Sequence, residues 1–176
     1  MNRAVFLDRD GVLNEPVIRD GKPYPPASVA ELVISPGAAE ALGALKRAGF
    51  QLIVVTNQPD VAYGKQTTAG VDAINAALAA ALPLDEFAVC WHSDADACSC
   101  RKPKPGLILD AAARRAIDVA SSFLIGDRWR DIDAAAAAGC RAVLIDRGYK
   151  ERGPEHAPEY RAKSLPDAVS WILSAR

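Results

Sequence analysis

The sequence contains few methionines, histidines and aromatic residues, and its charges nearly cancel. It has 1 Met, 2 His and 6% aromatic residues, and 21 Lys and Arg stand against 22 Asp and Glu. With a net charge of −1, it lacks the basic excess that sequence-independent binding of nucleic acid requires. No apolar run approaches the roughly 18 residues of a membrane span, and the apolar run near the N-terminus is too short for a signal peptide. We therefore expect a cytoplasmic protein that binds neither nucleic acid nor membrane.

The length and the apolar pattern predict an α/β fold. At 176 residues the chain has the size of one domain, 1–176, and we expect a monomer. Short β-type runs alternate with helical ones, which predicts a parallel sheet covered on both faces. The strands are expected at 5–7, 51–56, 86–90, 122–125 and 142–145, and the helices at 37–48, 68–82, 106–117, 129–138 and 166–174. The prediction is a Rossmann-like three-layer sandwich with a minimal cap and an irregular, proline-rich flap at about 11–35.

Three of the four cysteines lie close together with one histidine. They form the pattern C-x-H-x₅-C-x-C, made by Cys90, His92, Cys98 and Cys100. Four ligands of this kind suit a tetrahedral Zn²⁺ ion, although a chance group of reduced cysteines beside a surface histidine is the alternative. Because the protein fills all four positions, such a site is structural. We expect it to brace the loop at 90–102.

Polar residues follow three of the predicted strands. The first strand is followed by Asp8 and Asp10 in the sequence DRDG, the second ends at Thr56, and a later strand is followed by Asp127 and Asp131. In open α/β sheets, ligands bind beyond the carboxyl ends of the strands. The sequence therefore predicts one crevice that gathers several carboxylates and a hydroxyl group.

Clustered carboxylates favour a chemistry that uses a metal and a phosphate. A Mg²⁺ ion relieves the repulsion between them, and Asp8 and Asp127 are natural ligands for it. A carboxylate beside a metal can attack phosphorus and form an aspartyl-phosphate. A second acid two residues later, Asp10, could protonate the leaving oxygen and then deprotonate water. Alone, DRDG could equally be a turn after a strand, but the complete set favours phosphoryl transfer.

The motifs resemble the haloacid dehalogenase (HAD) superfamily of phosphohydrolases over almost the whole chain. The resemblance implies a Mg²⁺-dependent phosphatase in which Asp8 is the nucleophile and Asp10 the general acid and base. It is carried by FLDRDGVLN (6–14), VVTNQ (54–58), CRKPKPG (100–106) and LIGDRWRDI (124–132).

The same resemblance implies roles for the other site residues. Thr56 and Lys102 would hold the phosphoryl group, and Lys102 matches the family pattern better than Lys104 does. Mg²⁺ would be bound by Asp8, by the backbone carbonyl of Asp10 and by Asp127. Asp131 would lie behind these ligands and support them.

The cysteine loop followed by CRKPKPG resembles one branch of the superfamily. This branch contains phosphatases of D-glycero-D-manno-heptose 1,7-bisphosphate and histidinol-phosphatase domains. Asn14 and the Gly64-Lys65 loop favour the heptose enzymes, which remove the 7-phosphate, whereas the five residues between His92 and Cys98 are more similar to the histidinol-phosphatase domain. A phosphorylated sugar is thus the implied substrate. The residues implied to bind it are Asn57, Gln58, Arg101 and Arg128.

The chain departs from this branch at the loop after the second strand. Pro59 and Asp60 stand where the branch has Ser-Gly, and Tyr63 stands where it has an arginine. An arginine there could clamp a second phosphate, and a tyrosine cannot supply that charge. Recognition of a bisphosphate is therefore open. A histidinol-phosphate phosphatase and a non-catalytic, zinc-braced binding module remain alternatives.

Overall fold

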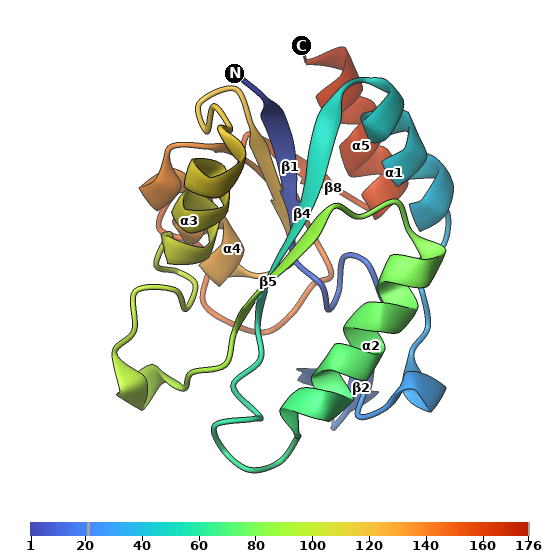
Figure 1. The fold of residues 1–176 in the computed structure, drawn as a ribbon, viewed down its shortest axis with the longest axis vertical. Helices are drawn as coiled ribbons and strands as arrows, with labels where there is room; N and C mark the ends of the chain where they lie inside the picture. Colours follow the sequence, from blue (N-terminus) through green and yellow to red (C-terminus); the bar gives the residue numbers. More distant parts are fainter. Residues whose placement is uncertain (21, 176) are drawn as a thin grey trace.

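A parallel sheet between two layers of helices forms the core of the computed structural model (Figure 1). The structure describes residues 1–20 and 22–175. The strands, in spatial order, are β5 (Glu86–Cys90), β4 (Phe50–Asn57), β1 (Arg3–Leu7), β6 (Phe123–Gly126), β7 (Arg141–Ile145) and β8 (Tyr160–Ala162). The α-helices are α1 (Ala38–Arg47), α2 (Thr68–Ala81), α3 (Gly106–Arg115), α4 (Trp129–Ala138) and α5 (Leu165–Ser174). The predicted three-layer α/β fold is confirmed.

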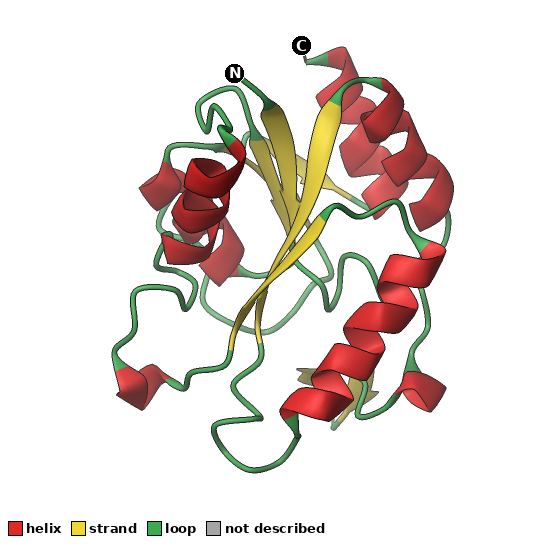
Figure 2. Ribbon diagram, in the orientation of Figure 1, coloured by secondary structure: helices red, strands yellow, loops and turns green. Residues whose placement is uncertain are grey.

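The central strands are apolar along their length because both faces of the sheet are covered. Val5 and Leu7 of β1 enter the core beneath α1, α2 and α5, whereas Ala4 and Phe6 enter the core beneath α3 and α4. Figure 2 shows these helices on opposite sides of the strands. None of the helices in the described part of the chain is long and apolar enough to cross a membrane.

Each element expected from the sequence is present, with ends that differ by no more than two residues. The prediction missed three short strands. β2 (Val17–Arg19) and β3 (Lys22–Tyr24) form an antiparallel hairpin inside the flap, and β8 pairs with the open edge of β7. The flap was therefore wrongly expected to be irregular throughout. Strands of three residues bury too little apolar surface to leave a periodic signal, and Pro23 of β3 is a residue that usually argues against a strand.

The order of the strands places the functional motifs side by side. β1 lies at the middle of the sheet, between β4 and β6. Asp8 follows β1, Thr56 lies near the end of β4, and Asp127 follows β6. Because all three strands are parallel, these residues meet at one edge of the sheet.

Candidate functional site

A buried lysine joins two of the predicted carboxylates. Lys102 Nζ lies 2.9 Å from Asp8 Oδ1 and 2.5 Å from Asp131 Oδ1, and it donates a hydrogen bond of 2.7 Å to the carbonyl oxygen of Val55. Burial alone would lower the pKa of Lys102, but the charges of Asp131 and Asp8 raise it. The ammonium group therefore keeps its charge in the site.

The backbone around Lys102 is fixed by an amide side chain from β4. Asn57 Oδ1 accepts a hydrogen bond from Lys102 N, and Asn57 Nδ2 donates one to Lys102 O, both at 3.0 Å. Lys104, the competing lysine, is exposed and donates instead to the carbonyl oxygen of Cys98. The geometry therefore places Lys102, and not Lys104, beside the carboxylates. Asn57 holds the backbone of Lys102 in position.

Three carboxylates converge where one ion could hold them. Asp8, Asp127 and Asp131 each offer an oxygen within 4.8 Å of the other two. Burial raises the pKa of Asp8 to about 7, and burial together with the charges of Asp8 and Asp131 raises that of Asp127. The single charge of Lys102 does not balance three acids. A hard divalent cation such as Mg²⁺ would, because it prefers carboxylate oxygens.

Two glycines make room for these acids. A Cβ atom on Gly11, whose φ is +86°, would lie 1.8 Å from Asp127 Oδ2, and one on Gly126 would lie 2.1 Å from the Cβ of Asp131. Asp127 Oδ1 is buried and has no hydrogen-bond partner among the described residues. An unpartnered buried oxygen beside two further carboxylates fits a metal ligand, so the residues present fit Mg²⁺.

Asp10 is not a member of this cluster and is held by a set of donors. The fully buried Arg9 donates from Nε to Asp10 Oδ1 (3.2 Å) and from its terminal nitrogen to Oδ2 (3.1 Å). Asn14 donates to Oδ1 at 3.1 Å and Gln58 to Oδ2 at 2.9 Å. Arg9 is fixed in turn by Asn75 of α2, at 3.0 Å. The carboxyl group of Asp10 is thus held in one orientation close to Asp8.

Gln58 also links Asp10 to the predicted phosphate-binding hydroxyl. Its Nε2 donates a hydrogen bond of 3.0 Å to Thr56 Oγ1. Gln58 and Thr56 are both buried, so neither is free to reorient in solvent. The structure therefore uses Gln58 to position two other site residues.

Most of these groups line a cleft of about 320 Å³, but the buried Thr56 and Arg9 are not among its lining residues. One wall comes from the flap through Pro16, Tyr24 and Pro25, and another from the loop after β4 through Pro59 and Asp60. The remaining lining residues are Asp8, Asp10, Pro23, Asn57, Gln58, Arg101, Lys102, Asp127, Arg128, Arg130 and Asp131. The lining thus combines five acidic and four basic side chains. A small cleft with several convergent charged groups suits a phosphorylated metabolite bound together with a metal ion.

The arginines of the cleft are held by acidic partners. Arg128 makes a two-pronged contact with Glu151, and Arg101 Nε donates to Asp94 Oδ1 at 2.8 Å. Arg130 shares that oxygen at 3.4 Å. Tyr63 is half exposed and is not among the residues that line the cleft.

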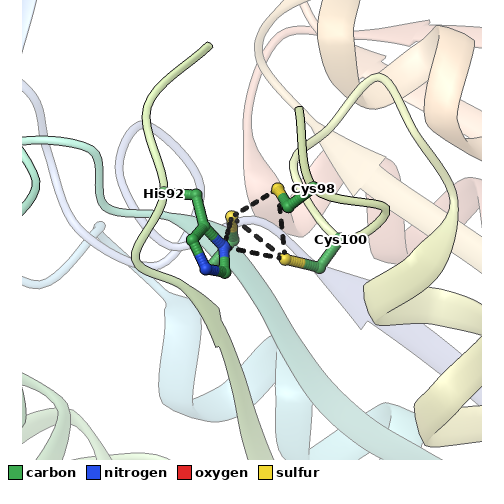
Figure 3. A group of neighbouring side chains, drawn as sticks. His92, Cys98 and Cys100 are labelled. Atoms are coloured by element: carbon green, nitrogen blue, oxygen red, sulfur yellow. Dashed lines mark hydrogen bonds between the residues drawn. The ribbon is translucent and has the colours of Figure 1, made fainter. Parts of the chain in front are cut away.

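The four predicted zinc ligands meet at a second cluster (Figure 3). The sulfur of Cys100 lies 3.3 Å from that of Cys90, 3.5 Å from that of Cys98 and 3.3 Å from Nδ1 of His92. Ligands at about 2.3 Å around a tetrahedral Zn²⁺ ion are separated by about 3.8 Å, which is close to these values. All four cysteines of the chain are free thiols. The cluster can therefore hold zinc.

The zinc cluster is tied directly to the cleft. Asp94, which binds Arg101, lies on the short 3₁₀ helix Asp94–Asp96 between the zinc ligands. Arg101 also donates to the carbonyl oxygen of His92 at 3.5 Å. Since Lys102 follows Arg101 and Cys100 in sequence, bracing this loop also places the lysine of the cleft.

The variant Cys98→Ser is expected to lose zinc and, indirectly, activity. Changes to the outer partners of metal ligands already cost about 10–100-fold in affinity, and loss of a ligand costs at least as much. We expect less than one zinc per chain by mass spectrometry of metals, together with faster proteolysis of the loop. Cys140→Ala, at a buried thiol outside the cluster, is the control and keeps one zinc. Retained equimolar zinc with unchanged kinetics in Cys98→Ser would contradict this assignment.

Several residues of the site were not identified from the sequence. Arg9 and Arg130 lie inside motifs quoted above but were given no role, whereas Tyr149 and Glu151 lie outside those motifs. These four residues contact predicted site residues, and Asn75 contacts Arg9. The position of Arg9 between two predicted catalytic acids was a signal that it belongs to the site. Tyr149 and Glu151 contact residues 22 and 23 positions earlier in the chain, and no sequence pattern indicates these contacts.

The comparisons with known proteins agree with this geometry. A family model described as HAD-hydrolase-like matches residues 99–171. The fold, the arrangement of the acids and the match to the family model agree. The chain is a phosphatase of the HAD-like hydrolases.

The similar proteins narrow this class. The D-glycero-beta-D-manno-heptose-1,7-bisphosphate 7-phosphatase of Bordetella bronchiseptica is 36% identical over 151 residues, which are 83% of this chain and 82% of that protein. The enzyme of the same name from Escherichia coli O6:H1 is 34% identical, covering 98% and 89%. A crystal structure of the B. bronchiseptica enzyme complexed with magnesium and phosphate has a TM-score of 0.82 at 32% identity, over 99% of both chains. The chain belongs to this heptose-bisphosphate phosphatase family.

Proposed function

We propose that the protein removes the 7-phosphate from D-glycero-D-manno-heptose 1,7-bisphosphate, acting as a cytoplasmic monomer that is one catalytic domain over 1–176. The observation that carries the chemistry is the cluster of Asp8, Asp127 and Asp131 around Lys102 at the ends of adjacent strands. The names of the similar proteins support the substrate. Four cysteines without disulfides, three of which form a metal cluster with His92, suit a reducing compartment.

In the first step, a carboxylate oxygen of Asp8 attacks the phosphorus of the 7-phosphate. The bond from phosphorus to the sugar oxygen breaks, and Asp10 gives that oxygen a proton. Lys102 and Thr56 bind phosphoryl oxygens, where stabilisation of developing charge contributes most. Asp8, Asp127 and the carbonyl group of Asp10 would hold Mg²⁺, which would supply the remaining positive charge when bound.

In the second step, water attacks the phosphorus of the aspartyl-phosphate. Asp10 takes a proton from the water, and the bond between phosphorus and Asp8 breaks. Inorganic phosphate leaves and Asp8 is regenerated as a carboxylate. The hydrogen bonds from Arg9 and Asn14 hold Asp10 in place for both transfers.

The second phosphate of the substrate needs cations at the rim of the cleft. Arg101, Arg128 and Arg130 line the same cleft as Asp8. They support recognition of a bisphosphate although Tyr63 carries no charge. The short loop between His92 and Cys98 favours the second candidate, histidinol phosphate.

A phosphate-release screen with Mg²⁺ and zinc-loaded enzyme tests the substrate. We expect kcat/KM to be highest for heptose 1,7-bisphosphate, by about tenfold or more over histidinol phosphate and simple sugar phosphates, which corresponds to about 1.4 kcal/mol. One phosphate is released per molecule, and the 1-phosphate remains. A preference for histidinol phosphate would select the second candidate, and no turnover of any phosphomonoester would identify a non-catalytic module.

A further inference from the structure

The segment after β7 folds back over the metal-binding edge of the sheet. Arg147 Nε donates to the carbonyl oxygen of Gly11 at 2.8 Å, and its terminal nitrogens bind Glu15 at 3.0 and 3.1 Å. Glu151, four residues further along, holds Arg128. The segment is therefore anchored on the loop after β1 and on the loop after β6, and Tyr149 lies between the two anchors.

Tyr149 contacts the acid that follows β6. Its hydroxyl group donates a hydrogen bond of 2.9 Å to Asp127 Oδ2. The ring also lies beside the guanidinium of Arg128, with 5.6 Å from Cζ to the ring centroid. Gly11 borders the same oxygen, so that Oδ2 is enclosed between a glycine and a phenol group.

The two oxygens of Asp127 thus have different surroundings. Oδ2 is satisfied by Tyr149, whereas Oδ1 is buried without a partner in the described part of the chain. A carboxylate can rotate, and the hydrogen bond to one oxygen fixes the direction of the other. A phenol hydroxyl group beside a carboxylate oxygen is the donor of the pair, and here it donates to Oδ2.

The geometry points to Tyr149 as a positioning residue for the metal: it holds Asp127 Oδ2 so that Oδ1 faces the ion bound with Asp8. Loss of a partner that orients a metal ligand typically costs about 10–100-fold in metal affinity or activity. Because Tyr149 contacts only the ligand Asp127 and not a reacting group, we expect its effect in metal affinity. This role rests on the proposed site, because it takes Asp127 to be a ligand of Mg²⁺.

The test compares Tyr149→Phe with Asp127→Asn and with Tyr160→Phe. Tyr160 is a matched control because its hydroxyl group binds Asp167 at 3.1 Å and does not contact the cleft. Mg²⁺ binding is measured by isothermal titration calorimetry, and the Mg²⁺ concentration for half-maximal turnover is measured with p-nitrophenyl phosphate.

For Tyr149→Phe we expect about tenfold weaker Mg²⁺ binding and an equal rise in the half-activating Mg²⁺ concentration. At saturating Mg²⁺, kcat stays within about twofold of the parent, a split that a general loss of structure does not produce. Tyr160→Phe binds Mg²⁺ as the parent does, and Asp127→Asn loses Mg²⁺ binding.

Unchanged Mg²⁺ affinity in Tyr149→Phe, with binding lost in Asp127→Asn, would overturn the role of Tyr149 alone. A fall in kcat at saturating Mg²⁺ without a change in affinity would also overturn it. Unchanged affinity in both variants would instead overturn the proposed metal site.

Discussion

Asp8→Asn should abolish turnover while the fold persists. An amide cannot form the phosphoryl bond, and loss of a nucleophile costs on the order of 10⁴-fold or more in kcat. Initial rates of phosphate release, together with circular dichroism, measure the two effects. Asp110→Asn, at an exposed position of α3, changes the same group without affecting activity. A variant with near-normal kcat would remove Asp8 from the role of nucleophile.

The same substitution should change how the stability of the magnesium-free protein depends on pH. Burial first, and then the charge of Asp131, raises the pKa of Asp8 from 3.8 to about 7. The folded state therefore binds this proton more tightly than the unfolded state does, and the stability it contributes is lost as pH rises from about 4 through about 7. In zinc-loaded protein without Mg²⁺, we expect the melting temperature of the parent to fall across this range and that of Asp8→Asn to fall less. Identical pH profiles would show that Asp8 titrates normally.

Lys102→Met should impair both stability and activity. Methionine fills a similar volume but leaves Asp8 and Asp131 without their shared cation, and removal of one partner of a buried ion pair costs about 3–5 kcal/mol. Loss of a group that stabilises the transferring phosphoryl oxygens costs about 10²–10³-fold in kcat. Urea unfolding and steady-state kinetics measure the two losses.

Lys104→Met is the matched control, two residues away. Lys104 is exposed and contacts only the carbonyl oxygen of Cys98 among the hydrogen bonds described above. We expect it to change stability by less than about 0.5 kcal/mol, as at an ordinary surface position. If Lys104→Met proved the more damaging of the two in kcat, the assignment of the phosphate-binding lysine would be reversed.

The sequence was sufficient for the order of elements and for the residues that follow strand ends. Asp8 and Asp127 could be placed together because parallel strands bring their carboxyl ends to one edge, whatever the details of packing. Cys90 and Cys100 could be assigned to one metal site because their spacing is that of a metal-binding loop. These conclusions depend on local patterns.

The contacts between loops could not be predicted in this way. Arg9 lies between two acids in the sequence, but only the structure shows that it is buried, fixed by Asn75 and bound to Asp10. Tyr149 lies in a segment with no periodic pattern, and its partner is 22 residues away. Such pairs depend on the path of irregular backbone, which leaves no repeating signal in the sequence. The strand β8 was missed for a related reason, because its pairing follows from the open edge of β7.

The central position of β1 also has a consequence for biosynthesis. Asp8 leaves the ribosome more than a hundred residues before β6, which must lie against β1, and before Tyr149. Until then the nascent chain has no neighbour on that flank and no assembled ion-binding edge. Hydrolytic competence is therefore acquired in a late event of synthesis, and a polypeptide released early stays inert toward the phosphorylated metabolites around it.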